Sequence, residues 1–323
     1  MKTVIPVASG KGGVGKSIFV ANLGVCLAQA GKTVVVVDLD LGGSNLHTCL
    51  GVRNSNAGIG QYIYEKDIRL EQLIIETDQR RLFIIPGDSL LPGTANLPYF
   101  RKRQLMKELS ALVADYVLLD LGAGSSFNTI DFFLASQNGI VVCTPETTSV
   151  LNAYSFLKGV AFRSMYRSFA SGSAERRLIH SYLTTRIEGS DRSIEKLMEE
   201  IGELSSESAM TARSARTAAQ VRVVLNMGKH SRDIAIGGKL RAISRKNLQT
   251  DVSYIGYLPY EPEMSTSILQ RRPLALLDPQ SPYVGALRSV ADRLMSEPGT
   301  NAFPYFEDDE DLHALSSKLD GTS

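Results

Sequence analysis

Apolar residues along the chain gather in short runs in which polar residues do not alternate with apolar ones. Such runs are typical of strands that are buried on both faces of a parallel sheet. Seven segments have this character: 4–8, 33–37, 82–85, 116–119, 139–143, 221–225 and 252–256. Each ends in a polar or glycine-rich turn. The pattern therefore predicts a mostly parallel sheet built from these seven strands.

Segments with apolar residues at helical spacing separate the strands, for instance 101–113, 148–166 and 229–248. This alternation predicts an α/β fold with a doubly wound sheet and right-handed crossovers. Two regions depart from it. We interpret the polar, helix-periodic segment of about 162–219 as a helical insertion within one domain that spans 1–297. Residues 298–323, which include an acidic run, are predicted to form a disordered tail.

The turn after the first predicted strand reads Gly-Lys-Gly-Gly-Val-Gly-Lys-Ser, at residues 10–17. It fits the phosphate-loop pattern G-x-x-x-x-G-K-[ST] and carries an additional lysine, Lys11. Glycines allow several backbone N–H groups to point at phosphate oxygens where a helix begins. In this pattern Lys16 reaches the β- and γ-phosphates, and the Ser17 hydroxyl binds Mg²⁺. We expect the nucleotide to contact Gly10, Lys11, Gly12, Gly13, Val14, Gly15, Lys16, Ser17 and Ile18.

The same glycines also fit the dinucleotide-binding pattern G-x-G-x-x-G, with Asp38 near the spacing of a ribose-binding acid. A pyrophosphate-binding loop has no use for a lysine and a hydroxyl directly after its third glycine. A triphosphate with magnesium needs both. The sequence therefore favours a nucleoside triphosphate with Mg²⁺.

Three aspartates follow predicted strands at the edge where the loop lies. Asp38 and Asp40 come directly after 33–37, and Asp120 follows 116–119. Aspartates at strand ends cap helices in many proteins, but beside a phosphate loop they typically serve magnesium. We predict that Ser17, Asp38 and Asp120 serve the metal and that Asp40 orients the attacking water. The predicted catalytic residues are Lys11, Lys16 and Asp40.

Recognition of the base is predicted from the later strands. Guanine specificity is typically associated with an N-K-x-D element, and the sequence has none. Asn226, after 221–225, and the segment 258–262, with Pro259 and Glu261, are positioned at strand ends where they can contact adenine. The alternative is that they are ordinary turn residues.

Composition narrows the class of protein. With 43% hydrophobic residues in 323, the chain can bury a large core, and its net charge of +1 gives no global field for nucleic acid or membranes. Three dispersed cysteines, Cys26, Cys49 and Cys143, argue against zinc, iron–sulfur or disulfide frameworks. The loop begins within ten residues of the start, and no apolar stretch has the length of a membrane helix. We expect a cytoplasmic protein with reduced thiols.

The loop with its early lysine, the Asp-Leu-Asp-Leu-Gly-Gly-Ser-Asn segment at 38–45 and the Asp-Leu-Gly-Ala-Gly segment at 120–124 resemble those of the deviant Walker A ATPases of the MinD/ParA group. The MinD and FlhG branch is the most similar. The resemblance implies a P-loop NTPase fold of the SIMIBI type, ATP and Mg²⁺ as ligands, and slow hydrolysis. It also implies a face-to-face homodimer in the ATP state, in which Lys11 reaches the partner's phosphates. A protein partner would stimulate or read that state.

The charge distribution raises further possibilities. Residues 220–250 hold seven basic side chains and one acidic one, whereas 296–323 hold seven acidic and one basic. The acidic tail differs from the basic membrane-binding helix of MinD-type proteins, which argues against membrane association. The alternative function is a ParA-like partition ATPase that binds DNA non-specifically through Lys239, Arg241, Arg245 and Lys246. A further hypothesis is that the acidic tail folds onto the basic helix at 229–246.

Overall fold

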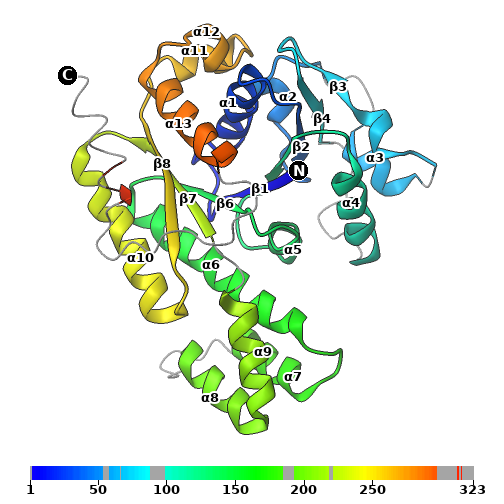
Figure 1. Cartoon of the computed structure of the whole chain (residues 1–323), viewed down its shortest axis with the longest axis vertical. Helices are drawn as coiled ribbons and strands as arrows, with labels where there is room; N and C mark the ends of the chain where they lie inside the picture. Colours follow the sequence, from blue (N-terminus) through cyan, green and yellow to red (C-terminus); the bar gives the residue numbers. More distant parts are fainter. Residues whose placement is uncertain are drawn as a thin grey trace.

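The computed structural model describes residues 2–53, 58–65, 67–87, 99–184, 193–217, 221–296, 311, 312 and 314. Its centre is an eight-stranded sheet with helices on both faces (Figure 1). The strands are β1 (Thr3–Ala8), β2 (Val34–Leu39), β3 (Ile75–Glu76), β4 (Leu82–Ile85), β5 (Tyr116–Leu121), β6 (Ile140–Cys143), β7 (Val221–Gly228) and β8 (Val252–Pro259). Their order across the sheet is β3-β4-β2-β5-β1-β6-β7-β8.

All seven predicted strands are present, and all their pairings are parallel. The additional strand β3 pairs with β4 in the antiparallel direction. The doubly wound α/β fold is therefore confirmed. The strand β1 pairs with β5 on one side and with β6 on the other, so the order of the strands reverses at β1. Ligands of such sheets bind at the carboxyl ends of the strands near the point of reversal.

Two apolar layers cover the sheet, because alternate side chains of each strand point to opposite faces. Val34 and Val36 of β2 pack with one layer, and Val35 and Val37 with the other. The first layer contains α1 (Lys16–Gln29), α2 (Leu46–Cys49), α12 (Leu274–Leu277) and α13 (Pro282–Ser296), with α11 (Met264–Leu269) beside them. The second contains α3 (Ile59–Tyr64), the 3-10 turn η1 (Leu70–Leu73), α4 (Tyr99–Ala111), α5 (Phe127–Phe133), α6 (Thr147–Ser168) and α10 (Ile234–Leu248), which follows the turn η2 (Ser231–Asp233).

Three further helices extend from the far end of α6 in Figure 1. They are α7 (Ala174–Thr184), α8 (Ile194–Leu204) and α9 (Ser206–Thr217), and α9 packs along α6. The hydroxyl of Ser193 caps α8 by accepting a hydrogen bond from the Lys196 amide at 3.2 Å. Ile194, Leu197 and Ile201 are buried as their helical spacing predicts. The interpretation of 162–219 as an insertion within one domain stays a prediction.

The tail predicted for 298–323 lies outside the described residues, except at 311, 312 and 314. Asp311 and Leu312 are 6% and 0% exposed, so the expectation of a solvated tail does not hold at these two positions. The three cysteines are free thiols, and burial raises the pKa of each, that of Cys143 to about 12. None of the described helices is both long and apolar enough to cross a membrane.

Candidate nucleotide-binding site

The glycine-rich loop joins β1 to α1 at the carboxyl edge of the sheet. Gly13 and Gly15 both have φ of +81°, a backbone conformation that side chains disfavour. Gly15 is the N-cap residue that directly precedes α1, and the first turn of α1 holds no acidic residue. The partial positive charge of the helix N-terminus is therefore directed at the loop, as an anion site requires.

At two positions of the loop, neighbouring residues leave no room for a side chain. A Cβ on Gly10 would lie 2.2 Å from the backbone carbonyl of Asn152 in α6, and a Cβ on Gly15 would lie 2.6 Å from Nδ2 of Asn226. Gly12, by contrast, has open space where a Cβ would lie, and it is exposed together with Gly13. The loop is thus anchored at its ends and accessible in its middle.

Lys16 and Asp120 form a buried ion pair beneath the loop. Their side chains are 7% and 1% exposed, and Nζ of Lys16 donates to Oδ1 of Asp120. Burial raises the pKa of Asp120, while the Lys16 ammonium opposes this rise. Oδ2 of Asp120 is buried and has no hydrogen-bond partner among the described residues, and Ser17 lies close enough to lower the pKa of Asp120. A free carboxylate oxygen beside a hydroxyl is a donor set that suits Mg²⁺.

Asp38 lies beside Asp120, because the two residues are register partners on β2 and β5. Its carboxylate is fully buried and accepts three hydrogen bonds from the segment that follows: from the Ser44 hydroxyl at 2.7 Å, the Leu46 amide at 3.1 Å and the Asp40 amide at 3.0 Å. Both oxygens are therefore already engaged. This geometry fits a residue that orders the 40–46 segment better than a direct metal ligand.

The Asp38 carboxyl gives a testable dependence of stability on pH. Burial and the nearby Asp120 charge raise its pKa to about 7. Between about pH 4 and pH 7 the folded chain therefore retains a proton that the unfolded chain releases, and this contribution to the free energy of unfolding falls as pH rises. We expect urea midpoints measured without Mg²⁺ to fall across this window, and to fall less in Asp38→Asn. Equal slopes for the two proteins would contradict the assignment.

Asp40 is half-buried at the end of β2 and faces the turn after β5. A Cβ on Gly122 would lie 3.4 Å from Oδ1 of Asp40, so the small residue leaves room for this carboxylate. The Gly42 amide donates to the same oxygen at a long 3.4 Å. Burial is the main cause of the raised pKa of Asp120, and the negative charge of Asp40 adds to this rise. The predicted water-orienting carboxylate and the predicted metal-side carboxylate therefore lie in one site.

The early lysine does not point into the loop. Nζ of Lys11 donates to Oε2 of Glu146 at 2.7 Å and to the Thr148 hydroxyl at 3.2 Å, at the start of α6. The side chains of Lys11 and Glu146 are 30% and 61% exposed, and the Lys11 ammonium holds the pKa of Glu146 below its usual value. Sequence reasoning missed Glu146 and Thr148, although both follow the strand at 139–143 and thus lie at the same edge.

The residues predicted to contact the base line one cavity. Asn226, Pro259 and Glu261 all contribute to it, together with Gly15 and Ile18, which were predicted as contacts of the phosphate loop. Nδ2 of Asn226 donates to the Val14 carbonyl at 2.8 Å, while its buried Oδ1 has no partner among the described residues. An unengaged acceptor fits the exocyclic amine of adenine. The cavity is also lined by Met227, Tyr260, Met264 and Tyr283. Of these four residues, only Tyr260 lies in the segment 258–262, which was predicted to contact the base.

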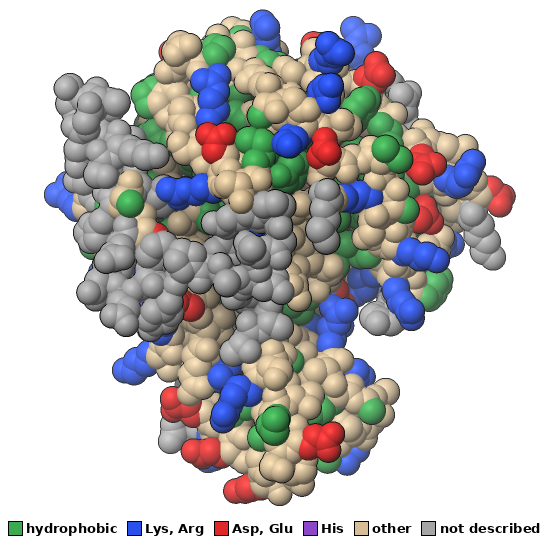
Figure 2. All heavy atoms as spheres, viewed as in Figure 1, with side chains coloured by type: hydrophobic (Ala, Val, Ile, Leu, Met, Phe, Trp, Pro, Cys, Tyr) green, Lys and Arg blue, Asp and Glu red, His purple; other side chains and the backbone are tan. Residues whose placement is uncertain are grey.

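Two of the four basic residues that the DNA-binding alternative requires are engaged within the chain. Arg241 is 2% exposed and pairs with Asp311, and Arg245 forms a two-point contact with Asp251 at 3.0 Å. Lys239 and Lys246 are exposed. On the face drawn in Figure 2, the described basic and acidic side chains are interspersed rather than gathered in one basic patch. The geometry therefore gives the DNA-binding alternative little support.

Together, the glycine-rich loop before α1 and the strand-end aspartates define a P-loop nucleotide-binding protein. The model of the CobQ/CobB/MinD/ParA nucleotide binding domain matches residues 5–274, and the chain belongs to this family. The resemblance to the MinD/ParA group is thereby confirmed.

Curated relatives include the septum site-determining protein MinD of Helicobacter pylori, 35% identical over 163 residues, which are 46% of this chain and 56% of that protein. The flagellum site-determining protein YlxH of the same organism is 34% identical over 161 residues, 48% and 52% of the two chains. The chain spans about half the length of the curated relatives it matches. The structure of Pyrococcus horikoshii MinD with Mg-ADP has a TM-score of 0.62 at 21% identity, covering 91% of this chain and 96% of that one, which shows a shared fold.

Proposed function

We propose that the chain is a Mg²⁺-dependent ATPase that works as a dimerising switch in the cytoplasm. Its nucleotide state would control the placement or assembly of a partner machinery, such as the division septum or the flagellum, through a protein that reads or stimulates that state. The relatives named for septum and flagellum sites support this choice of process. The observation that carries the proposal is the position of Lys11, a loop lysine held outside its own phosphate site by an exposed contact.

The residues of the site divide into distinct roles in this proposal. Lys16 and the loop amides bind the phosphates, and Asn226 with the cavity around it binds adenine. Mg²⁺, when bound, would neutralise phosphate charge, held by Ser17 and by Asp120 acting directly or through water. Asp40 orients the attacking water, and Asp38 holds the segment that carries Asp40.

The location of Lys11 links ATP binding to association. One lysine within the loop does not neutralise a triphosphate, so a second cation supplied by a partner subunit stabilises the ATP state more than the ADP state. A ligand stabilises the assembly that binds it best, and ATP therefore favours the dimer. Breaking the contact between Lys11 and Glu146 costs little, because an exposed ion pair contributes only about 0.2–1 kcal/mol.

Association measured by analytical ultracentrifugation tests this proposal. We expect a monomer with Mg-ADP and twice that mass with a non-hydrolysable ATP analogue. Glu146→Gln removes the charge that holds Lys11 in the monomer, and each dimer breaks two such contacts. The variant should therefore dimerise about 2–30-fold more tightly with the analogue.

The matched control is Glu195→Gln, on α8, which should leave the dimer dissociation constant unchanged. A chain that remains monomeric with the analogue would overturn the proposed switch. A dimer that is unaffected by Glu146→Gln would retain the switch but remove Glu146 from it.

A further inference from the structure

Among the strands of the described residues, β8 lies at the edge of the sheet and pairs with β7 alone. An edge strand presents backbone N–H and C=O groups that no further strand takes up. Two of these groups are bound here by side chains instead. The Tyr254 amide donates to Oδ2 of Asp311 at 2.9 Å, and Nε of Arg241 donates to the Val252 carbonyl at 3.2 Å. Side chains of Asp311 and Arg241 thus bind two backbone groups of β8 that a further strand would otherwise bind.

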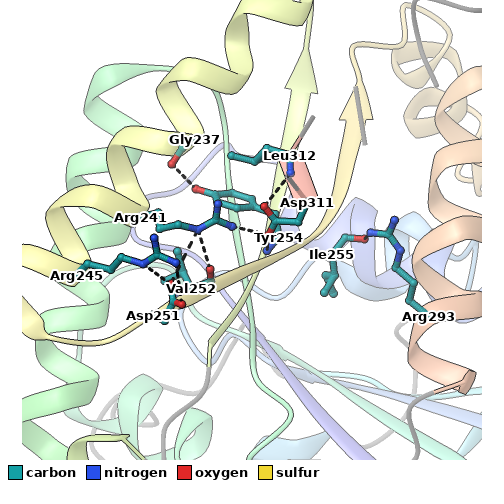
Figure 3. Close-up of polar contacts among 10 residues, drawn as sticks. All are labelled: Gly237, Arg241, Arg245, Asp251, Val252, Tyr254, Ile255, Arg293, Asp311 and Leu312. Carbon is teal, nitrogen blue, oxygen red and sulfur yellow. Dashed lines mark hydrogen bonds and ion pairs between the residues drawn. The ribbon is translucent and has the colours of Figure 1, made fainter. Parts of the chain in front are cut away.

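Arg241 and Asp311 also bind each other. Nη2 of Arg241 donates to Oδ2 of Asp311, and both side chains are 3% exposed. The guanidinium carbon lies 5.2 Å from the centroid of the Tyr254 ring (Figure 3). A charge buried to this degree is strongly unfavourable without its partner. The arginine therefore makes the surface of α10 and β8 a specific receptor for one carboxylate.

The next residue, Leu312, is fully buried beside Gly237 of α10. A Cβ on Gly237 would lie 3.2 Å from Cδ1 of Leu312 and 3.4 Å from Cζ of Tyr254. The Gly237 carbonyl accepts a hydrogen bond from the Tyr254 hydroxyl at 2.7 Å, which fixes the two residues that Leu312 packs against. The Leu312 amide donates to Oδ1 of Asp311 at 2.8 Å, so both carboxylate oxygens are engaged. Figure 3 shows the two residues between α10 and β8.

We propose that α10 and β8 form a binding site for an aspartate followed by a leucine, and that Asp311 and Leu312 of the same chain fill it as a latch. The occupant is the seated segment itself, and charge complementarity supports it. Asp311 ends the acidic run at 307–311, while α10 belongs to the basic segment 220–250. Release of the latch would expose a carboxylate-binding arginine and two backbone groups of an edge strand.

Amide hydrogen exchange in the full-length chain tests the latch. Asp311→Ala removes the acceptor of the Tyr254 amide, and loss of a buried hydrogen bond to a charged group should speed its exchange by about 10–100-fold. Leu312→Ala keeps the ion pair and should give a smaller change in the same direction. Asp309→Ala, in the same acidic run, is the matched control and should leave Tyr254 unchanged. Unchanged exchange in β1 and β6 confirms that each variant is folded.

A peptide added in trans then tests the recognition itself. A synthetic peptide of residues 305–316 should restore the protection of the Tyr254 amide in Asp311→Ala. The same peptide carrying Asp311→Asn should restore less. Equal exchange in wild type and Asp311→Ala, or equal rescue by both peptides, would overturn the proposal. Protection in the wild type that grows with protein concentration would show a second copy as the occupant and overturn the intramolecular latch.

Discussion

Replacing Lys16 with alanine should abolish nucleotide binding and also destabilise the chain when no nucleotide is present. The lysine is the hydrogen-bonding cation of the buried Asp120 carboxylate. Removal of one partner from a buried ion pair costs about 3–5 kcal/mol, because the remaining charge is left without compensation. Urea unfolding at pH 8 measures this loss, and titration with a fluorescent ATP analogue measures the loss of binding.

The double variant Lys16→Ala/Asp120→Ala separates the two effects. It also removes the Asp120 carboxylate that Lys16→Ala leaves without a cation, so it should recover part of the lost stability. It should not recover nucleotide binding. Since burial favours protonation of Asp120, the cost of Lys16→Ala alone should shrink as pH falls. A single variant as stable as the wild type at pH 8 would contradict a buried, charged Asp120.

Replacing Asp40 with alanine should leave ATP binding intact and slow hydrolysis by about 100-fold or more, as loss of a positioned proton acceptor does in other enzymes. Asp40 is only half-buried, and among the described contacts its side chain accepts one long hydrogen bond. The fold therefore has little dependence on it. Phosphate release under single-turnover conditions measures the chemical step, and dimers should persist in ATP.

Asp40→Asn serves as the matched control, because an amide can orient water without accepting its proton. It should be slower than the wild type and faster than Asp40→Ala. If Asp40→Ala hydrolyses ATP within tenfold of the wild-type rate, another group positions the water, and the assignment of Asp40 fails.

The sequence predicts those parts of the fold that depend on local patterns. Runs such as 34–37 are buried on both faces, and this is why their hydrophobicity alone identifies a parallel strand. The strand β3 has only two residues, Ile75 and Glu76, and pairs in the other direction. So short a segment has no periodicity to detect.

The candidate site was predicted to the extent that its residues share the ends of parallel strands. Asn226 and Pro259 line one cavity with Gly15 for this reason. Tyr283 also lines it, but it comes from α13, and nothing in its local sequence marks a helix residue as part of a cavity. The sequence pattern places Lys11 and Glu146 at the same edge of the sheet, but it does not show that these two side chains form a pair.

The fate of the acidic segment shows the limit of charge patterns. Composition predicts a solvated tail at 298–323, yet Asp311 and Leu312 are buried. Their burial depends on Gly237, whose missing side chain makes room, and on Arg241, which needs a carboxylate. Neither requirement is visible from the tail itself. The ion pair between Arg241 and Asp311 agrees with the hypothesis that acidic residues fold onto the basic helix at this one contact, and the hypothesis otherwise stays a prediction.

The central claim is that Lys11 serves the nucleotide of the partner subunit, and mixing two inactive variants tests it most directly. Lys11→Ala lacks the lysine, and Asp40→Ala lacks the water-orienting carboxylate. In a mixed dimer the Lys11→Ala subunit retains Asp40 and receives Lys11 from its partner, so one of the two sites is complete. Random pairing of equal amounts should restore about a quarter of the wild-type ATPase activity, as transition-state stabilisation by a partner's cation requires. A mixture as inactive as its components, with mixed dimers shown to form, would place Lys11 on its own nucleotide and contradict the account.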